Sequence, residues 1–481
     1  MLREMKHLLF LLSLVVASTF FGRNARGDEG FFHTEMIGQR WWLIAPDGKP
    51  FISKGVDSIQ LAQDAIQGTI ISPYALAAVA KYGSPEAWRA ATAEQLAGWE
   101  FNTLGAWSDE KVSHALKDGR RFAYAPMLDI GSWFVGKKQG GQAWLQGIFP
   151  DVFDPDFEKF AYQRAAEVAA GRAEDHWLLG WFIDNELRWG PDWRGRDELL
   201  TMFLALPAGT PGRKAAIELL RGRYGEIAKF NEVWNTAFHS WDEVDGAGAL
   251  NPPFVRKAVY QQNQEVERKA DEADPKRAAF VGDCDAFLGR LAEEYFRITN
   301  GAIRHADPNH MNFGCRFAYV PPAPVVAAAA KYVDVISFNC YDFDPRSAIE
   351  KYSVFGKPLI IGEFSFRGAD SGLPNAKGAG PVVKTQAERA AAFEKYVTLG
   401  LGTPALVGYH WFEHADEPKE GRFDGENSNY GVVNIQDEPY EELTRAMMRV
   451  NGDAEKLHGE KNEAPNPNGS TPALPGTKQS R

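Results

Sequence analysis

Short apolar segments alternate with helical segments along most of the chain. Eight apolar runs are nearly continuous, as in strands that are buried on both faces. They are Phe51–Ile59, Phe101–Trp107, Phe122–Ile130, Leu178–Glu186, Asn312–Ala318, Val333–Phe343, Pro358–Phe366 and Ala405–Phe412. Helical patterns lie between them, including Pro85–Trp99, Asp154–Ala170, Pro321–Lys331, Gln386–Leu401 and Tyr440–Val450. This alternation favours a parallel sheet, and eight such units predict an α/β protein with a closed (β/α)₈ TIM barrel.

Two segments fall outside this alternation. Residues 190–301 contain no strand pattern and are polar and helical, so we expect a helical insertion after strand 4 that includes the fourth barrel helix. Near the start, a turn signal at Pro46-Asp47-Gly48 predicts a small hairpin, which we expect to cover the bottom of the barrel. The barrel is therefore expected to span residues 31–452.

The two ends of the chain differ from this central part. Arg3 and Lys6 precede an apolar run, Leu8–Phe21, which is too short to span a bilayer and is typical of a signal peptide. We expect a signal peptide within residues 1–27 and a secreted or periplasmic protein; an uncleaved anchor is the alternative. No other segment is apolar enough to suggest a membrane span. Residues 453–481 are rich in Pro, Asn, Gly and Lys, which predicts a disordered tail.

Composition narrows the class of partner. The formal net charge is -11, from 53 Lys and Arg against 64 Asp and Glu. This balance argues against nucleic-acid binding, which requires neutralisation of phosphates, and mildly against a sulfated polymer. The three cysteines, Cys284, Cys315 and Cys340, form neither a disulfide framework nor a metal-ligand spacing. The 14 Trp, 15 Tyr and 31 Phe suit a sugar-binding cleft, because the apolar face of a pyranose packs on a flat ring.

Two glutamates end predicted strands on opposite sides of the barrel. The active site of such a barrel lies at the carboxyl ends of its strands. Asn185-Glu186 ends strand 4 and Glu363 lies near the end of strand 7, so both carboxylates can reach one bound sugar. Glycoside hydrolysis needs such a pair, and a separation of ~5–5.5 Å indicates a retaining mechanism. We predict Glu186 as the acid/base and Glu363 as the nucleophile.

Other polar and aromatic residues at strand ends are candidates for substrate binding. They are Asp57, Trp107, Asn185, Arg316, Asn339, Tyr341, His410 and Trp411. We expect Asn185 to bind the 2-hydroxyl of the sugar and Trp411 to act as a sugar platform. A hydrogen bond from Arg316 or Tyr341 would keep the pKa of Glu363 low, and the charge of Glu363 would raise that of Glu186. Each of these residues also has a purely structural interpretation, as an ion-pair partner or a core side chain. The chemistry requires no cofactor and no metal site is predicted, but a structural cation near the acidic loop after strand 8 stays open.

The motifs resemble clan A of the glycoside hydrolases, and more narrowly family 50, the β-agarases. They are WWLIAPDGKPFISKGVDSI (41–59), LLGWFIDNELRWG (178–190), RYGEIAKFNEVWNTAFHSW (223–241), NFGCRFA (312–318), GEFSFRGADSGL (362–373) and GYHWFEHADEPKEGRFDGENSNYGVVNIQDEPY (408–440). The resemblance implies retaining cleavage of β-1,4-galactosidic bonds in agarose or its oligosaccharides, with Glu186 as acid/base and Glu363 as nucleophile. The N-terminal carbohydrate-binding domain usual in the family is expected to be missing, since only a short segment precedes the hairpin.

Three functions follow from these patterns. The first is a retaining hydrolase of β-galactosidic linkages in agarose or agaro-oligosaccharides. The second keeps the mechanism and changes the substrate to another β-galactan or a β-glucan. The third is a non-catalytic surface protein that binds glycans on the same fold. The expected partner is an oligo- or polysaccharide; endo or exo attack and the oligomeric state stay open.

Overall fold

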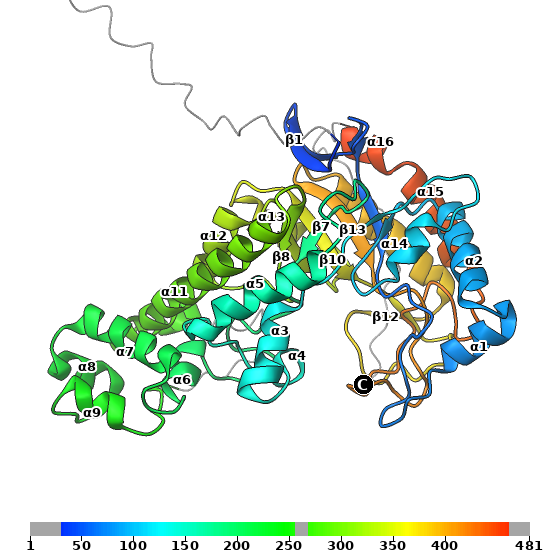
Figure 1. Ribbon diagram of the computed structural model, residues 1–481. Helices are drawn as coiled ribbons and strands as arrows, with labels where there is room; N and C mark the ends of the chain where they lie inside the picture. The colour runs from blue at the N-terminus through cyan, green and yellow to red at the C-terminus, as the bar shows by residue number, and fades with distance from the viewer. Residues whose placement is uncertain (1–29, 255–267, 461–481) are drawn as a thin grey trace, which may run out of the picture.

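A computed structural model describes residues 30–254 and 268–460 (Figure 1). Its larger parallel sheet has six strands in the order β6-β5-β4-β13-β10-β9, and a smaller sheet pairs β7 with β8. The strands are β4 (Ser53–Val56), β5 (Thr103–Leu104), β6 (Ala123–Tyr124), β7 (Gly180–Phe182), β8 (Met311–Gly314), β9 (Ile336–Asn339), β10 (Leu359–Phe364) and β13 (Leu406–Trp411). Seven of the eight predicted runs contain one of these strands, and the eighth, Asn312–Ala318, overlaps β8, which begins one residue earlier. The prediction of an α/β protein built on parallel strands is therefore confirmed.

Isolated parallel bridges connect the two sheets. Tyr124 of β6 pairs with Leu178, and Phe182 of β7 pairs with Met127. On the other side, Phe317 follows β8 and pairs with Phe338 of β9. Parallel pairing thus continues from both edges of the larger sheet to the smaller one.

Helices alternate with these strands. They include α1 (Pro73–Tyr82), α2 (Pro85–Gly98), α3 (Ile130–Phe134), α4 (Ala143–Gln146), α5 (Pro155–Ala169), α12 (Ala323–Tyr332), α13 (Arg346–Ser353), α14 (Gln386–Leu401) and α15 (Glu441–Gly452). The five helical segments predicted by periodicity are all present. Helices α1, α3, α4 and α13 are not among the segments named from the sequence. Helix α1 begins where Ser72 caps its N-terminus and Pro73 occupies the first turn, a combination that favours helix initiation.

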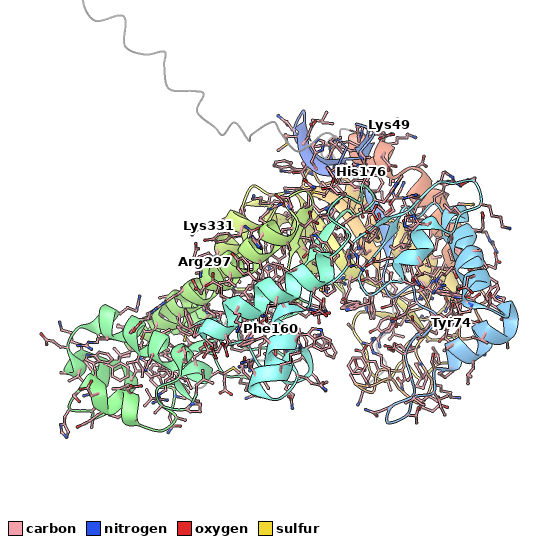
Figure 2. The ribbon with its side chains drawn as sticks, viewed as in Figure 1. Lys49, Tyr74, Phe160, His176, Arg297 and Lys331 are labelled. Carbon is pink, nitrogen blue, oxygen red and sulfur yellow. The ribbon has the colours of Figure 1, made fainter. Side chains whose placement is uncertain are left out.

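The described part of the segment between β7 and β8 is largely helical. It contains α6 (Leu199–Leu204), α7 (Pro211–Tyr224), α8 (Ile227–Trp234), α9 (Trp241–Gly246) and the long α11 (Pro275–Ala306). Helix α11 packs against α5 and α12 beside the strands, and also against α6, α7 and α8. Figure 1 shows α7, α8 and α9 at the end of the molecule farthest from the sheet. On the outer surface, Lys331 of α12 pairs with Glu293 of α11 at 2.7 Å (Figure 2).

The predicted N-terminal hairpin is an antiparallel sheet. Strands β1 (His33–Ile37), β2 (Arg40–Ile44) and β3 (Pro50–Phe51) pair in that order, with Gly48 at φ 79° in the turn between β2 and β3. Leu43 of β2 is fully buried, in one apolar cluster with strand residues such as Phe182 and Phe313. The hairpin therefore closes one end of the core formed by the strands.

The C-terminal part differs from its prediction. Residues Ala454–Gly459 form α16, inside the segment expected to be a disordered tail from residue 453. The cause is local packing: buried His458 bridges the carbonyls of Leu401 and Trp41 at 3.0 and 2.8 Å. The remaining tail and the predicted signal peptide lie outside the described residues. Within the described ranges, no helix has both the length and the apolarity to cross a membrane.

Candidate active site

A cleft of about 2200 Å³ lies where several of the parallel strands end. Six of the predicted site residues line it: Trp107, Asn185, Glu186, Asn339, Tyr341 and Glu363. They follow or end β5, β7, β9 and β10, so the cleft is at the carboxyl ends of the strands, where an α/β protein of this type places its chemistry.

The carboxylate of Glu363, a residue of β10, is oriented by two hydrogen-bond donors. Its carboxylate accepts a hydrogen bond of 2.6 Å from Arg316 Nη2 and one of 2.7 Å from the Tyr341 hydroxyl. Both contacts were predicted, and both favour the ionised form. Burial nevertheless raises the pKa of Glu363 above its usual value, and nearby Asp57 adds to this rise. The expectation of a low pKa therefore does not hold, because desolvation outweighs the two donors.

Arg316 and Asp57 lie beneath the cleft and do not line it. The fully buried guanidinium of Arg316 also donates to Asp57 Oδ2 at 2.8 Å and lies 4.8 Å from the centre of the Trp107 ring. Burial raises the pKa of Asp57 to about 6, although Arg316 opposes this shift. The prediction that Asp57 and Arg316 contact substrate is wrong for this geometry, since neither side chain is accessible. They are positioning residues that orient Glu363.

Glu186 receives a different set of partners. Trp144 Nε1 donates to its Oε2 at 2.8 Å, and Asn339 Nδ2 donates to its Oε1 at 2.9 Å. Burial and the charge of Glu363 raise the pKa of Glu186, as the sequence predicted for the acid of the pair. Asn339 also donates to Asn185 Oδ1 at 3.3 Å, so the two amides form one network with the carboxylate.

Asp184 supports the loop that carries Glu186. Its buried carboxylate accepts hydrogen bonds from the backbone N–H groups of Gly131 and Ser132 at 2.7 and 2.9 Å. A third comes from the hydroxyl of Tyr295 in α11 at 2.7 Å. The loop after β7 is thereby fixed to α3 and α11, which holds Glu186 at φ 51°, a conformation that few non-glycine residues adopt.

Two residues of β13 are not at the site. Trp411 is fully buried, packs on Phe364 and donates to the carbonyl of Tyr430 at 2.8 Å. His410 is also fully buried and shares a hydrogen bond of 2.9 Å with the Ser53 hydroxyl. Burial lowers the pKa of His410 to about 3, so the ring is neutral. The predictions of Trp411 as a sugar platform and of His410 as a substrate contact are wrong, because β13 turns both rings into the core.

Replacing Trp411 by phenylalanine tests this correction. We expect a loss of about 1–3 kcal/mol in the free energy of unfolding, because the buried Tyr430 carbonyl loses its shorter hydrogen bond and keeps only the one from the N–H of Glu413 at 3.4 Å. Urea unfolding measures this change, and isothermal titration with a glycan measures affinity. A variant with full stability and a much weaker affinity would restore Trp411 as a binding residue.

Several aromatic residues of the cleft were missed by sequence reasoning. Trp133, Trp193 and Phe423 line it and are each about half exposed. Phe412, one residue beyond β13, also lines it, and Trp144 contacts both Glu186 and the Phe423 ring, at 6.1 Å between centroids. All but Phe412 come from loops or short helices with no periodic pattern, so the only sequence signal was an aromatic outside the predicted strands. Such rings offer flat faces for sugars.

Comparison with curated proteins identifies relatives of the chain. No protein-family model matches the sequence. Beta-agarase B of Vibrio sp. (strain JT0107) is 27% identical over 90% of this chain, and Beta-agarase A of the same strain is 31% identical over 85%. The chain spans about half the length of these curated relatives, 49% and 44%.

Solved structures extend the same resemblance. PfGH50B has a TM-score of 0.72 and 28% identity, covering 91% of this chain and 68% of that chain. An exo-beta-agarase has a TM-score of 0.71 and 26% identity, covering 90% of this chain and 66% of that chain. The chain is thus similar, over most of its length, to glycoside hydrolases. More narrowly, the predicted resemblance to the family 50 β-agarases is confirmed.

Proposed function

We propose that this chain is a retaining glycoside hydrolase that cleaves β-galactosidic linkages in agarose or agaro-oligosaccharides. The observation that carries the proposal is that two buried carboxylates in one cleft have different hydrogen-bond donors and different charged neighbours. Glu363 accepts hydrogen bonds from a guanidinium and a phenol. Glu186 accepts them only from neutral N–H groups, and the negative charge of Glu363 lies near it. Carboxylates in environments that separate their proton affinities are the usual assignment of nucleophile and acid.

The reaction then follows in two displacements. Glu363 attacks the anomeric carbon while Glu186 gives its proton to the departing glycosidic oxygen, which leaves a covalent glycosyl-enzyme. The ester carries no charge, so the repulsion that raised the pKa of Glu186 disappears and Glu186 becomes a base. It removes a proton from water, the water oxygen attacks the anomeric carbon, and Glu363 departs as a carboxylate.

The proposal includes the closed (β/α)₈ barrel and export of the protein. Parallel bridges at both edges of the six-stranded sheet support closure through β7 and β8. Closure would set Glu186, after β7, and Glu363, in β10, across one barrel mouth. The apolar run Leu8–Phe21 supports a signal peptide and residence outside the cytoplasm.

The choice of glycan rests on the relatives and on charge. Both curated relatives are agarases, and a net charge of -11 favours a neutral galactan over a sulfated one. Half-exposed Trp133, Trp193 and Phe423 would pack on sugar rings along the cleft. Another β-galactan or a β-glucan is the alternative substrate, and glycan binding without hydrolysis is the alternative function.

Incubation of the full chain with agarose and with neoagaro-oligosaccharides tests the proposal. Mass spectrometry identifies products, and NMR at early times identifies the anomer released. We expect galactosidic products that first appear as the β-anomer. Release of the α-anomer would contradict retention, products only from other β-glycans would contradict the substrate, and binding without products would favour the non-catalytic function.

Replacing Tyr341 by phenylalanine should lower kcat/KM by about 10- to 100-fold, the equivalent of one hydrogen bond to a charged group. Loss of the hydroxyl removes a donor that stabilises ionised Glu363, so the pKa of Glu363 rises further. The acidic limb of the pH profile should therefore move to higher pH. Tyr430→Phe is the matched control, since the Tyr430 hydroxyl contacts Ala379 and not Glu363. An unchanged acidic limb in Tyr341→Phe would contradict this role.

A further inference from the structure

A cluster of acidic side chains lies in the wall of the cleft, between the loops that follow β4 and β13. Its carboxylates surround one guanidinium, that of Arg422, at distances of 2.9–3.9 Å. They belong to Asp64, Glu413, Glu417, Asp424 and Glu426. Five carboxylates against a single arginine leave the cluster short of positive charge.

Arg422 donates aligned hydrogen bonds to two of these carboxylates. Nε and Nη2 donate to Asp424 at 3.0–3.2 Å, and Nη2 donates to Glu426 at 2.9 Å. Nη1 lies 3.6 Å from Asp64 Oδ2 and 3.9 Å from Glu413 Oε1, beyond hydrogen-bond distance. Nε also lies 3.0 Å from Glu417 Oε1, where the two groups form an ion pair without an aligned hydrogen bond. Asp64, Glu413 and Glu417 therefore share a single guanidinium.

One carboxylate oxygen of each of these three residues lacks an aligned hydrogen-bond donor. Asp64 Oδ2, Glu413 Oε1 and Glu417 Oε1 face Arg422 at 3.6, 3.9 and 3.0 Å but accept no aligned hydrogen bond, and Glu413 and Glu417 are at least 99% buried. One oxygen from each of the three residues lies within 4.8 Å of the others. Gln63, 98% buried, donates to Glu413 Oε2 at 2.8 Å and leaves its own Oε1 unpaired. Buried acceptors without partners are costly, so this group needs a ligand that supplies positive charge.

We propose that Asp64, Glu413 and Glu417 bind one divalent cation of the hard, oxygen-seeking type, for which Ca²⁺ is the probe. Carboxylate and amide oxygens, with no nitrogen or sulfur ligand among the converging side chains, are the donor set that such cations prefer. Gln63, which donates to Glu413, carries a further unpaired oxygen, Oε1.

The cation would join two loops that form one wall of the cleft. Asp64 follows β4, whereas Glu413 and Glu417 follow β13, so a shared ion replaces repulsion between the loops with a bridge. Phe412 precedes Glu413 and Phe423 follows Arg422, and both rings line the cleft. Binding should therefore stabilise the fold and the aromatic wall together, whatever glycan the cleft accepts.

The full chain is first freed of metal ions with a chelator. Its binding of Ca²⁺ then tests the site without reference to activity. We expect elemental analysis to find one Ca²⁺ per chain after gel filtration in buffer that contains about 1 mM Ca²⁺. This concentration corresponds to the weakest-binding class of protein calcium sites. The melting temperature should rise on addition of Ca²⁺ and fall again with excess chelator. No bound Ca²⁺ together with an unchanged melting temperature would overturn the proposal.

Two matched variants locate the ion. Asp64 and Glu426 have the same side-chain exposure, 19%, but only Glu426 accepts a hydrogen bond from Arg422. Asp64→Asn should weaken Ca²⁺ binding at least tenfold and abolish the calcium-dependent rise in melting temperature, whereas Glu426→Gln should keep both. Glu417→Gln repeats the test if Asp64→Asn does not fold. Equal binding by wild type and by Asp64→Asn would place the ion elsewhere and overturn the proposal.

Discussion

Replacing Glu363 by glutamine should reduce turnover of agaro-oligosaccharides by at least about 10⁴-fold, because the amide cannot attack the anomeric carbon. Glutamine has nearly the same shape as glutamate and can still contact Arg316 and Tyr341 at the positions that now hold the carboxylate. Affinity for the glycan should therefore change little. Initial rates by reducing-end assay and affinity by titration calorimetry separate the two effects.

Asp342→Asn is the matched control for this variant. Asp342 lines the same cleft, but its carboxylate is exposed and accepts the N–H of Phe343. Its replacement should leave turnover close to that of wild type. Turnover of Glu363→Gln near the wild-type rate, with the fold intact by circular dichroism, would remove Glu363 from the proposed mechanism.

Much of the strand framework could be predicted because each strand is an apolar run buried on both faces. The runs were longer than the strands, however. The predicted Phe101–Trp107 contains β5 at Thr103–Leu104 only, since the chain leaves the ladder at Gly105 and turns toward the cleft. Helix α1 was not named from the sequence because it follows a polar loop after β4, where no periodic pattern marks its start. Ser72 and Pro73 were the available signals.

The site was partly predictable for the same reason. Glu186 and Glu363 stand at strand ends, and strand ends converge whatever the loops do. A single step along a strand reverses the face of a side chain, so the position of a ring depends on where β13 ends. The sequence alone did not show that Trp411 packs inside and Phe412 reaches the cleft. Trp144 comes from a short helix outside the strands, and its bond to Glu186 depends on tertiary packing.

The rate lost on replacing Glu186 should depend on the leaving group of the substrate, whereas the rate lost on replacing Glu363 should not. Glu186→Gln removes the proton donor. Cleavage of a galactosidic bond whose leaving group is the hydroxyl of another sugar should therefore slow by about 10²- to 10⁴-fold. An aryl galactoside with an acidic phenol needs no proton, so its first displacement should proceed near the wild-type rate. The basic limb of the pH profile should also disappear, because that limb reports the loss of the Glu186 proton. Equal losses with both kinds of substrate would contradict the role of acid.

Azide distinguishes the two carboxylates by the product that it forms. In Glu186→Ala, the aryl galactoside still esterifies Glu363, and azide then displaces Glu363 from the opposite face to give the β-galactosyl azide. In Glu363→Ala no ester forms, so azide occupies the vacated face, displaces the leaving group directly and gives the α-azide. The structure favours this assignment, because Arg316 and Tyr341 hold Glu363 as the carboxylate, while Trp144 and Asn339 orient Glu186. An α-azide from Glu186→Ala with a β-azide from Glu363→Ala would exchange the roles, since a single displacement inverts the anomeric carbon and two displacements retain it.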